Sequence, residues 1–214
     1  MLNGLIDTLA TAGGPATAPG FAVAPGVVTN NLDLTGEGRV QVRVPTRPGL
    51  EPWARLLGVG GGPDRGFVWT PQVDDEVLVA FHHDDATDAY VLGGLWNARD
   101  KAPLGGPQDF LTKRKLKTGV SKAPGHEVEF DDLKQSITIK TSTGQKVTMD
   151  PTTIEVVNTA GTLKLTLDDK TQTVTLEGIN VEIKATARLT ISAMNVDIKG
   201  DALTSVSGSL VKIN

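Results

Sequence analysis

The sequence predicts an all-β protein, with a small barrel in its first half and a stacked repeat of short strands in its second. The 214 residues include 24 glycines and 12 prolines but only nine aromatic residues, a profile typical of short strands joined by turns. Short runs of alternating apolar and polar residues indicate strands with one wet face. A unit of about eight residues then recurs from Glu127 onward, and such a period is typical of stacked architectures.

Composition excludes several classes of protein and site. The chain has no cysteine, which removes disulfides, thiolate metal sites and thiol nucleophiles. A net charge of −4 argues against a dedicated nucleic-acid binder, because surfaces that follow phosphates are usually basic. No apolar run approaches the roughly 20 residues of a membrane span, and no secretion signal is evident in residues 1–20.

The first half divides into an arm and a barrel. Residues 1–25 are rich in Gly, Pro and Ala after a short helical pattern, and we expect a flexible or docked arm. Residues 26–103 contain β-type runs bounded by Gly, Pro, Asn or Asp, which predict a five- or six-stranded barrel of the OB type. The predicted strands are 27–30, 39–44, 54–59, 66–70, 76–81 and 89–96.

A change of composition marks a boundary near residue 105. Residues 1–109 hold seven basic and thirteen acidic side chains, and residues 110–214 hold fourteen basic and twelve acidic ones. Residues 104–126 are rich in Gly, Pro and Lys without a clear period, so we expect a linker or collar there. The cluster KRKLK at 113–117 could contact phosphate, but neutralising acidic surfaces of a neighbouring subunit or hub is the favoured interpretation.

Residues 127–214 repeat a pair of apolar residues separated by one polar residue. We expect these pairs to form the core of a needle. They are Val128/Phe130, Ile137/Ile139, Val147/Met149, Ile154/Val156, Leu163/Leu165, Val174/Leu176, Val181/Ile183, Leu189/Ile191, Val196/Ile198 and Val211/Ile213.

Each unit offers only two inward side chains, so the units must stack to bury enough surface. A triangular β-prism allows this, with one chain supplying all three faces or three chains supplying one strand each. About 90 residues would give a lone chain fewer than four coils, whereas three chains would make a rod of roughly 50 Å. We therefore favour an intertwined homotrimeric β-helix.

Each motif that could indicate a metal, catalytic or phosphate-binding site has a simpler structural interpretation. The run HHDD at 82–85 could suggest a metal cluster, but adjacent strand residues point to opposite faces, so we expect a solvated loop. His126 is expected to be a polar collar residue. The acidic pairs at 74–75, 131–132 and 168–169 could suggest glycosidase chemistry, but all lie between apolar runs and are expected to form turns. The glycines at 58–66 lack the Lys-Ser/Thr ending of a phosphate loop.

The three tryptophans leave a nucleic-acid function open. Trp53, Trp69 and Trp96 lie in or beside predicted barrel strands and could form a stacking platform for bases. We favour packing in the core or in an interface, because barrels need a few large side chains. We therefore predict no catalytic residue, no metal site and no cofactor.

Several ordered motifs between Gly26 and Pro103 carry a family resemblance. They are GVVTNNLD at 26–33, GRVQVRVP at 38–45, PWARLL at 52–57, GFVWTPQVDDEVLVAFHHDD at 66–85 and VLGGLWNARDKAP at 91–103. This segment resembles the OB domain of contractile-tail spike proteins, namely phage baseplate assembly protein V and type VI secretion VgrG proteins. The repeat after it looks like the family's trimeric β-helical needle. Asp74 stands where the family usually has Gly, a change that a turn tolerates.

The resemblance implies a function and partners. It implies a non-enzymatic, membrane-piercing central spike of a contractile injection apparatus at the baseplate or tail tip, assembled in the bacterial cytoplasm. The expected partners are two further copies, a separate hub protein, a PAAR-type cap and, on firing, the target envelope. The chain ends SGSLVKIN without the His-containing tip of some spikes, so no tip metal is expected. Two alternatives remain: a polysaccharide-degrading enzyme on a single-chain β-helix, and an OB-fold protein that binds nucleic acid.

Overall fold

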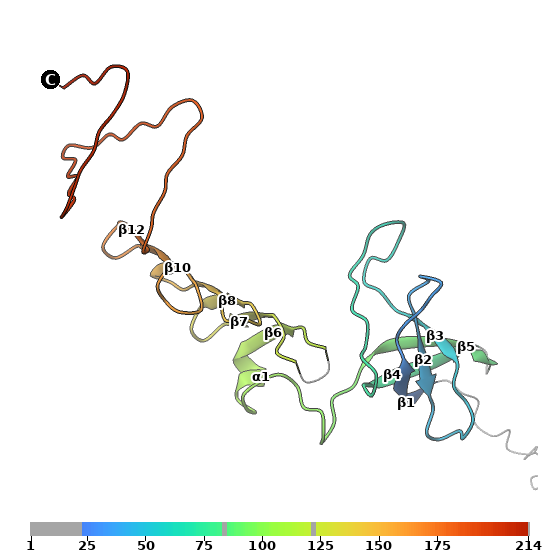
Figure 1. Ribbon diagram of the computed structural model, residues 1–214. Helices are drawn as coiled ribbons and strands as arrows, with labels where there is room; N and C mark the ends of the chain where they lie inside the picture. Colours follow the sequence, from blue (N-terminus) through green and yellow to red (C-terminus); the bar gives the residue numbers. More distant parts are fainter. Residues whose placement is uncertain (1–22, 83–84, 121–122, 214) are drawn as a thin grey trace, which may run out of the picture.

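The computed structural model describes residues 23–82, 85–120 and 123–213. It has two β-structures in series, a barrel and a long single sheet (Figure 1). Most of the predicted arm, residues 1–25, lies outside the described residues; its last three belong to the first barrel strand. In the described part of the chain no helix is long and apolar enough to cross a membrane.

The first structure is a closed five-stranded barrel. Its strands are β1 (Val23–Asn30), β2 (Arg39–Arg43), β3 (Trp53–Leu56), β4 (Glu76–His82) and β5 (Asp85–Gly94). They close in the order β1-β2-β3-β5-β4, with β3 and β5 parallel and the other pairs antiparallel. Closure removes the free edges that an open sheet would expose.

Valines fill the barrel core. Alternation along β2 buries Val40 and Val42 completely, and Val77 and Val79 of β4 are equally buried. Gly26 of β1 passes so close to Val42 that a side chain there would overlap it. Small and β-branched side chains therefore suffice. The tryptophans were expected in the core or in an interface, and Trp69 and Trp96 do not lie in the core, because they are 46% and 69% exposed.

The predicted strand at 66–70 is also absent. Residues 57–75 form a long β3–β4 loop, in which Phe67, Val68 and Trp69 are exposed. Gly66 has a φ of 135°, a conformation that interrupts a regular strand and that side chains disfavour.

A connector leads from the barrel to the second structure. It contains the one-turn helix α1 (Asp109–Thr112) and runs directly into strand β6 (Lys113–Lys117). Residues 104–126, expected to form a linker or collar, thus include a helical turn and a strand. Leu116 lies opposite Val128, so the basic cluster supplies the first strand of the long sheet.

The second structure is a seven-stranded antiparallel meander. After β6 come β7 (Glu127–Asp131), β8 (Ser136–Lys140), β9 (Lys146–Met149), β10 (Thr153–Val157), β11 (Lys164–Asp168) and β12 (Thr173–Glu177). Each strand pairs with its neighbours in sequence. Residues 178–213 contain neither strand nor helix and follow β12 as an irregular trace (Figure 1).

Aspartates at the ends of strands accept hydrogen bonds from the turns of the meander. Asp131 accepts the backbone N–H of Lys134, and Asp168 accepts those of Lys170 and Thr171. The acidic pairs at 131–132 and 168–169 therefore lie where a strand ends and a turn begins. Gln135 and Gln172 occupy equivalent places with a φ of 52°, so these two hairpins use the same turn.

Candidate functional site: the apolar face of the seven-stranded sheet

Strand pairing gathers the apolar residues of the meander on one face. Directly opposed residues of antiparallel strands lie on the same side of a sheet, so the register defines two rows. The first row is Leu116, Val128, Ile139, Val147, Val156, Leu165 and Leu176; the second is Phe130, Ile137, Met149, Ile154, Leu167 and Val174. We call these thirteen side chains the apolar face. Arg114, opposite Phe130, shares this face at the end nearest the barrel.

The opposite face is polar and internally paired. Lys115 contacts Glu129 at 2.6 Å and Glu127 at 3.2 Å, and Lys164 contacts Glu155 at 2.9 Å. Partial burial lowers the pKa of Lys115, but hydrogen bonds to the two glutamates outweigh that effect and leave the pKa raised. The basic cluster at 113–117 is thus neutralised largely within its own chain, contrary to the expected neighbouring subunit or hub.

The two faces show the reverse of ordinary burial. The Glu155 side chain is 27% exposed, whereas the neighbouring Val156 is 42% exposed. Along the same face Val174 reaches 72% and Leu176 57%. An apolar surface of this extent is far larger than the isolated patches normal on monomers. Among the described residues, much of the apolar face therefore has no cover.

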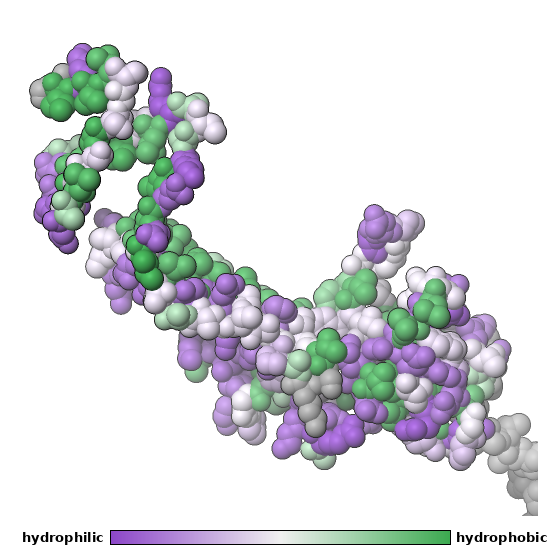
Figure 2. Space-filling view, in the orientation of Figure 1, coloured by the Kyte–Doolittle hydropathy of each residue, from purple (hydrophilic) through white to green (hydrophobic). Residues whose placement is uncertain are grey.

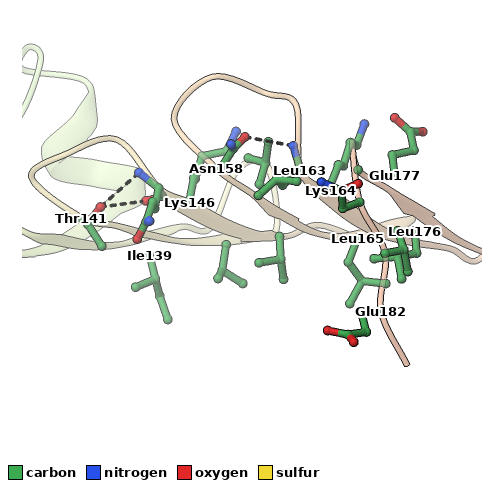
Figure 3. Close-up of a pocket in the computed structure, with 17 residues that line it drawn as sticks. Ile139, Thr141, Lys146, Asn158, Leu163, Lys164, Leu165, Leu176, Glu177 and Glu182 are labelled. Carbon is green, nitrogen blue, oxygen red and sulfur yellow. Dashed lines mark hydrogen bonds between the residues drawn. The ribbon is translucent and has the colours of Figure 1, made fainter. Parts of the chain in front are cut away.

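The chain beyond β12 forms a groove with this face. The groove has a volume of about 600 Å³ and is lined by Ile139, Val147, Val156 and Leu165 together with Val181. In the close-up, Ile139, Leu165 and Glu182 lie on one side of the strands and Lys164 on the other (Figure 3). The segment after Gly178 therefore begins to pass along the apolar side but covers only its end.

The predicted needle-core residues fall into three groups. Eleven lie on the apolar face, and Leu163 does not: it precedes β11, in the turn where its N–H donates to Asn158. Leu167 takes its place in the row. The remaining eight, Val181, Ile183, Leu189, Ile191, Val196, Ile198, Val211 and Ile213, lie in the segment without strands, and all are more than 45% exposed.

Aligning the two equivalent turns would have given the correct register. Asp131 and Asp168 both end a strand and are followed by the Gln of positive φ four residues later. Counting back from each aspartate makes Leu165 and Leu167 the counterparts of Val128 and Phe130. The prediction instead followed the spacing of the pairs, which varies from unit to unit.

The other candidate groups lie apart from this face. His82 ends β4, is exposed and lies 3.3 Å from Asp88; His83 and Asp84 lie outside the described residues. The Nδ1 of His126 accepts the N–H of Ser142. Among the described residues no three His, Asp or Glu side chains are arranged to hold a metal.

Hydrogen bonds to one aspartate organise the loop between β1 and β2. Asp33 accepts hydrogen bonds from the backbone of Thr35, Glu37 and Arg39 and from the Arg39 guanidinium. The Arg39 side chain is the main reason why the pKa of Asp33 lies well below its ordinary range. Asp74 has a φ of 75°, a conformation that favours Gly, in agreement with the Gly expected there from the resemblance.

A comparison with protein families identifies the family of the barrel domain. Residues 24–96 match the family model of the type VI secretion system and phage-baseplate injector OB domain. The barrel belongs to this family. The matched residues include all five barrel strands except the first residue of β1.

The match of the barrel to the injector OB domain gives coarse indications of function. It supports a structural role in a baseplate, a tail-tip location and association with other baseplate components. No curated protein matches the chain. The seven-stranded sheet lies outside the matched segment, so its role rests on its own geometry.

Proposed function

We propose that the protein is the central spike of a contractile injection apparatus, a homotrimer whose three apolar faces meet around one axis. The observation that carries the proposal is the uncovered apolar face of β6–β12, which directly follows an injector OB domain. Three such faces, packed about 10 Å apart, would bury one another and leave the paired charges of the opposite faces in water.

Two structural regimes would follow one another along the rod. In residues 113–177 each chain supplies one complete face, because its strands already pair with one another. In residues 178–213 similar aliphatic pairs continue, but no strand forms there in the part of the chain that the structure describes. We propose that these residues pair between chains and wind around the axis, which would prevent a single chain from leaving the trimer.

The function of such a rod is mechanical and involves no chemical step. Bending or shortening it would break many backbone hydrogen bonds together, so it would transmit an axial push when the sheath contracts. The barrels would join the rod to a separate hub protein, and a PAAR-type protein would cap the tip that meets the target envelope. Assembly would take place in the bacterial cytoplasm, before firing.

The native mass tests the trimer. Sedimentation equilibrium of the purified chain should give three times the chain mass of 22.5 kDa, with a complex that resists heat and detergent. A mass of one chain would overturn the proposal. Particles whose spike lacks residues 127–214 should assemble poorly or fail to pierce envelopes, and unimpaired injection by such particles would contradict the piercing role.

A further inference from the structure

The barrel carries a second large apolar surface that its family membership does not explain. It lies on the β3–β4 loop and the segment after β5, and we call it the loop surface. Its members and their exposed fractions are Val68 (82%), Val59 (78%), Leu57 (70%), Trp96 (69%), Phe67 (50%) and Trp69 (46%). Figure 2 shows hydrophobic residues at the base of the loop and hydrophilic residues at its tip.

This surface is organised before any partner binds. The N–H of Phe67 donates to the carbonyl of Val59 at 3.0 Å, and Gly62 and Arg65 form a two-residue bridge at the tip. The rings of Phe67 and Trp69 stack with their centroids 5.8 Å apart. A preformed surface of aromatic and aliphatic side chains loses little entropy on binding, and exposed surfaces of this kind mark interaction sites.

Two hollows connect the loop surface to the start of the sheet. One, of about 560 Å³, is lined by the loop and by the end of β5, including Trp69, Trp96 and Asp100. The other, of about 960 Å³, shares those three residues and continues to residues 117–119, where β6 ends. The loop surface is therefore continuous with the end of the sheet on which the apolar face begins.

We propose that the loop surface is covered by the barrel of a neighbouring copy of this chain. The inference rests on the proposed trimer, in which the connector of residues 95–112 would gather three barrels at one end of the rod. A cyclic trimer requires two different surfaces of each subunit to meet, and a projecting loop beside a hollow supplies both.

The charges around the hollow also fit a second copy. The larger hollow is lined by three acidic residues, Asp74, Asp75 and Asp100, and by three basic ones, Arg99, Lys101 and Lys117. A strongly charged partner would meet unfavourable charges there, whereas another copy of the chain offers both signs. The loop tip likewise carries one of each, Asp64 and Arg65.

Thiol labelling tests the inference on the full chain. The protein has no cysteine, so each variant carries one thiol. In the isolated chain Val68 and Leu34 are similarly exposed, at 82% and 89%, and Leu34 lies in the separate β1–β2 loop. In the native trimer we expect Val68→Cys to react with a maleimide at least tenfold more slowly than Leu34→Cys, and equally fast in denaturant.

The outcomes separate this inference from the proposed function. A monomeric mass overturns both, whereas a trimer in which the two thiols react equally fast overturns only the covered loop surface. If deletion of residues 1–22 makes Val68→Cys react as fast as Leu34→Cys while the trimer persists, the arm is the cover and the inference is wrong. The purified chain contains no hub, so protection in it cannot come from that partner.

A measurement on the unmodified protein covers the case in which a cysteine variant fails to assemble. If neighbouring copies cover Trp69 and Trp96, acrylamide should quench tryptophan fluorescence weakly in the trimer and strongly after denaturation. Quenching of the native trimer to the extent expected for two half-exposed indoles would overturn the inference.

Discussion

Two adjacent valines in β10 offer the sharpest test of the apolar face. Val156 lies in the first row between Val147 and Leu165, and it is 42% exposed in the isolated chain. Val157 lies on the opposite face, with Lys146 and Lys164 directly across from it. Replacing each valine by aspartate makes the same chemical change on the two faces.

The expected cost of Val156→Asp follows from the proposed trimer. Completing the burial of the valine is worth about 1 kcal/mol, and burying an unpaired carboxylate costs several kcal/mol more. A loss of about 4 kcal/mol per chain is about 12 kcal/mol per trimer. Because 1.4 kcal/mol corresponds to a factor of ten, the assembly constant should fall by roughly nine orders of magnitude. Val157→Asp gains two opposite-charge neighbours, worth about 0.2–1 kcal/mol each, and should assemble normally.

Light scattering and circular dichroism of the two variants measure this difference. Val156→Asp should remain folded in its barrel but elute as a monomer or as disordered aggregates, while Val157→Asp keeps the native mass. A stable trimer of Val156→Asp would refute the inward orientation of the apolar face. Dissociation of both variants would show that β10 tolerates no charge, and the assignment of faces would fail.

Three smaller predictions concern the barrel and the turns. Gly26→Ala should lower the free energy of unfolding of the barrel by about 1–3 kcal/mol, because the new methyl overlaps Val42; an unchanged denaturation midpoint would contradict the packing. Asp74 has a φ of 75°, so Asp74→Gly should be tolerated, and Asp74→Val should be about 1–2 kcal/mol less stable than the glycine variant in thermal unfolding. Hydrogen bonds, led by that from the Thr153 hydroxyl, lower the pKa of Asp150 to about 2, below its unfolded value near 3.9. The ionised Asp150 therefore adds to the free energy of unfolding above about pH 4, and this addition is lost as the pH falls towards 2. The melting temperature of Asp150→Asn should accordingly fall less steeply over that range than that of the wild type.

The barrel could be predicted from sequence where alternation was regular and not where glycine broke it. Five of the six expected runs contain strands, because alternating apolar residues such as Val40 and Val42 specify a buried face. The run at 66–70 has equally strong β-formers but follows a glycine-rich loop, and Gly66 adopts a positive φ. Residue preference alone could not reveal that this run has no neighbouring strand to pair with.

The sheet shows a different limit of the sequence pattern. The Gly, Pro and Lys content of residues 104–126 suggested a linker or collar, yet each of the three lysines of β6 lies across from an acidic residue of β7. The charges of β6 and β7 are complementary in the sequence. A rule that seeks pairs of apolar residues nevertheless does not detect β6, because its two positions on the apolar face are Arg114 and Leu116. Pairing the lysines of this segment with the acidic residues of the next one in an antiparallel hairpin would have identified β6.

The segment after β12 shows why a local pattern is not sufficient for a strand. Val181 and Ile183 flank Glu182 just as Val128 and Phe130 flank Glu129, but only the second set lies in a strand. The side chains are equivalent, so the difference must lie in the backbone partners. β7 has β6 and β8 beside it, whereas residues 178–213 have no paired strand within the described chain. A strand without neighbours leaves its N–H and C=O groups to water and gains too little to offset the entropy of ordering. We therefore expect this segment to become ordered only when other copies supply the pairing, so its amide hydrogen exchange should be slow in the assembled protein and fast in Val156→Asp.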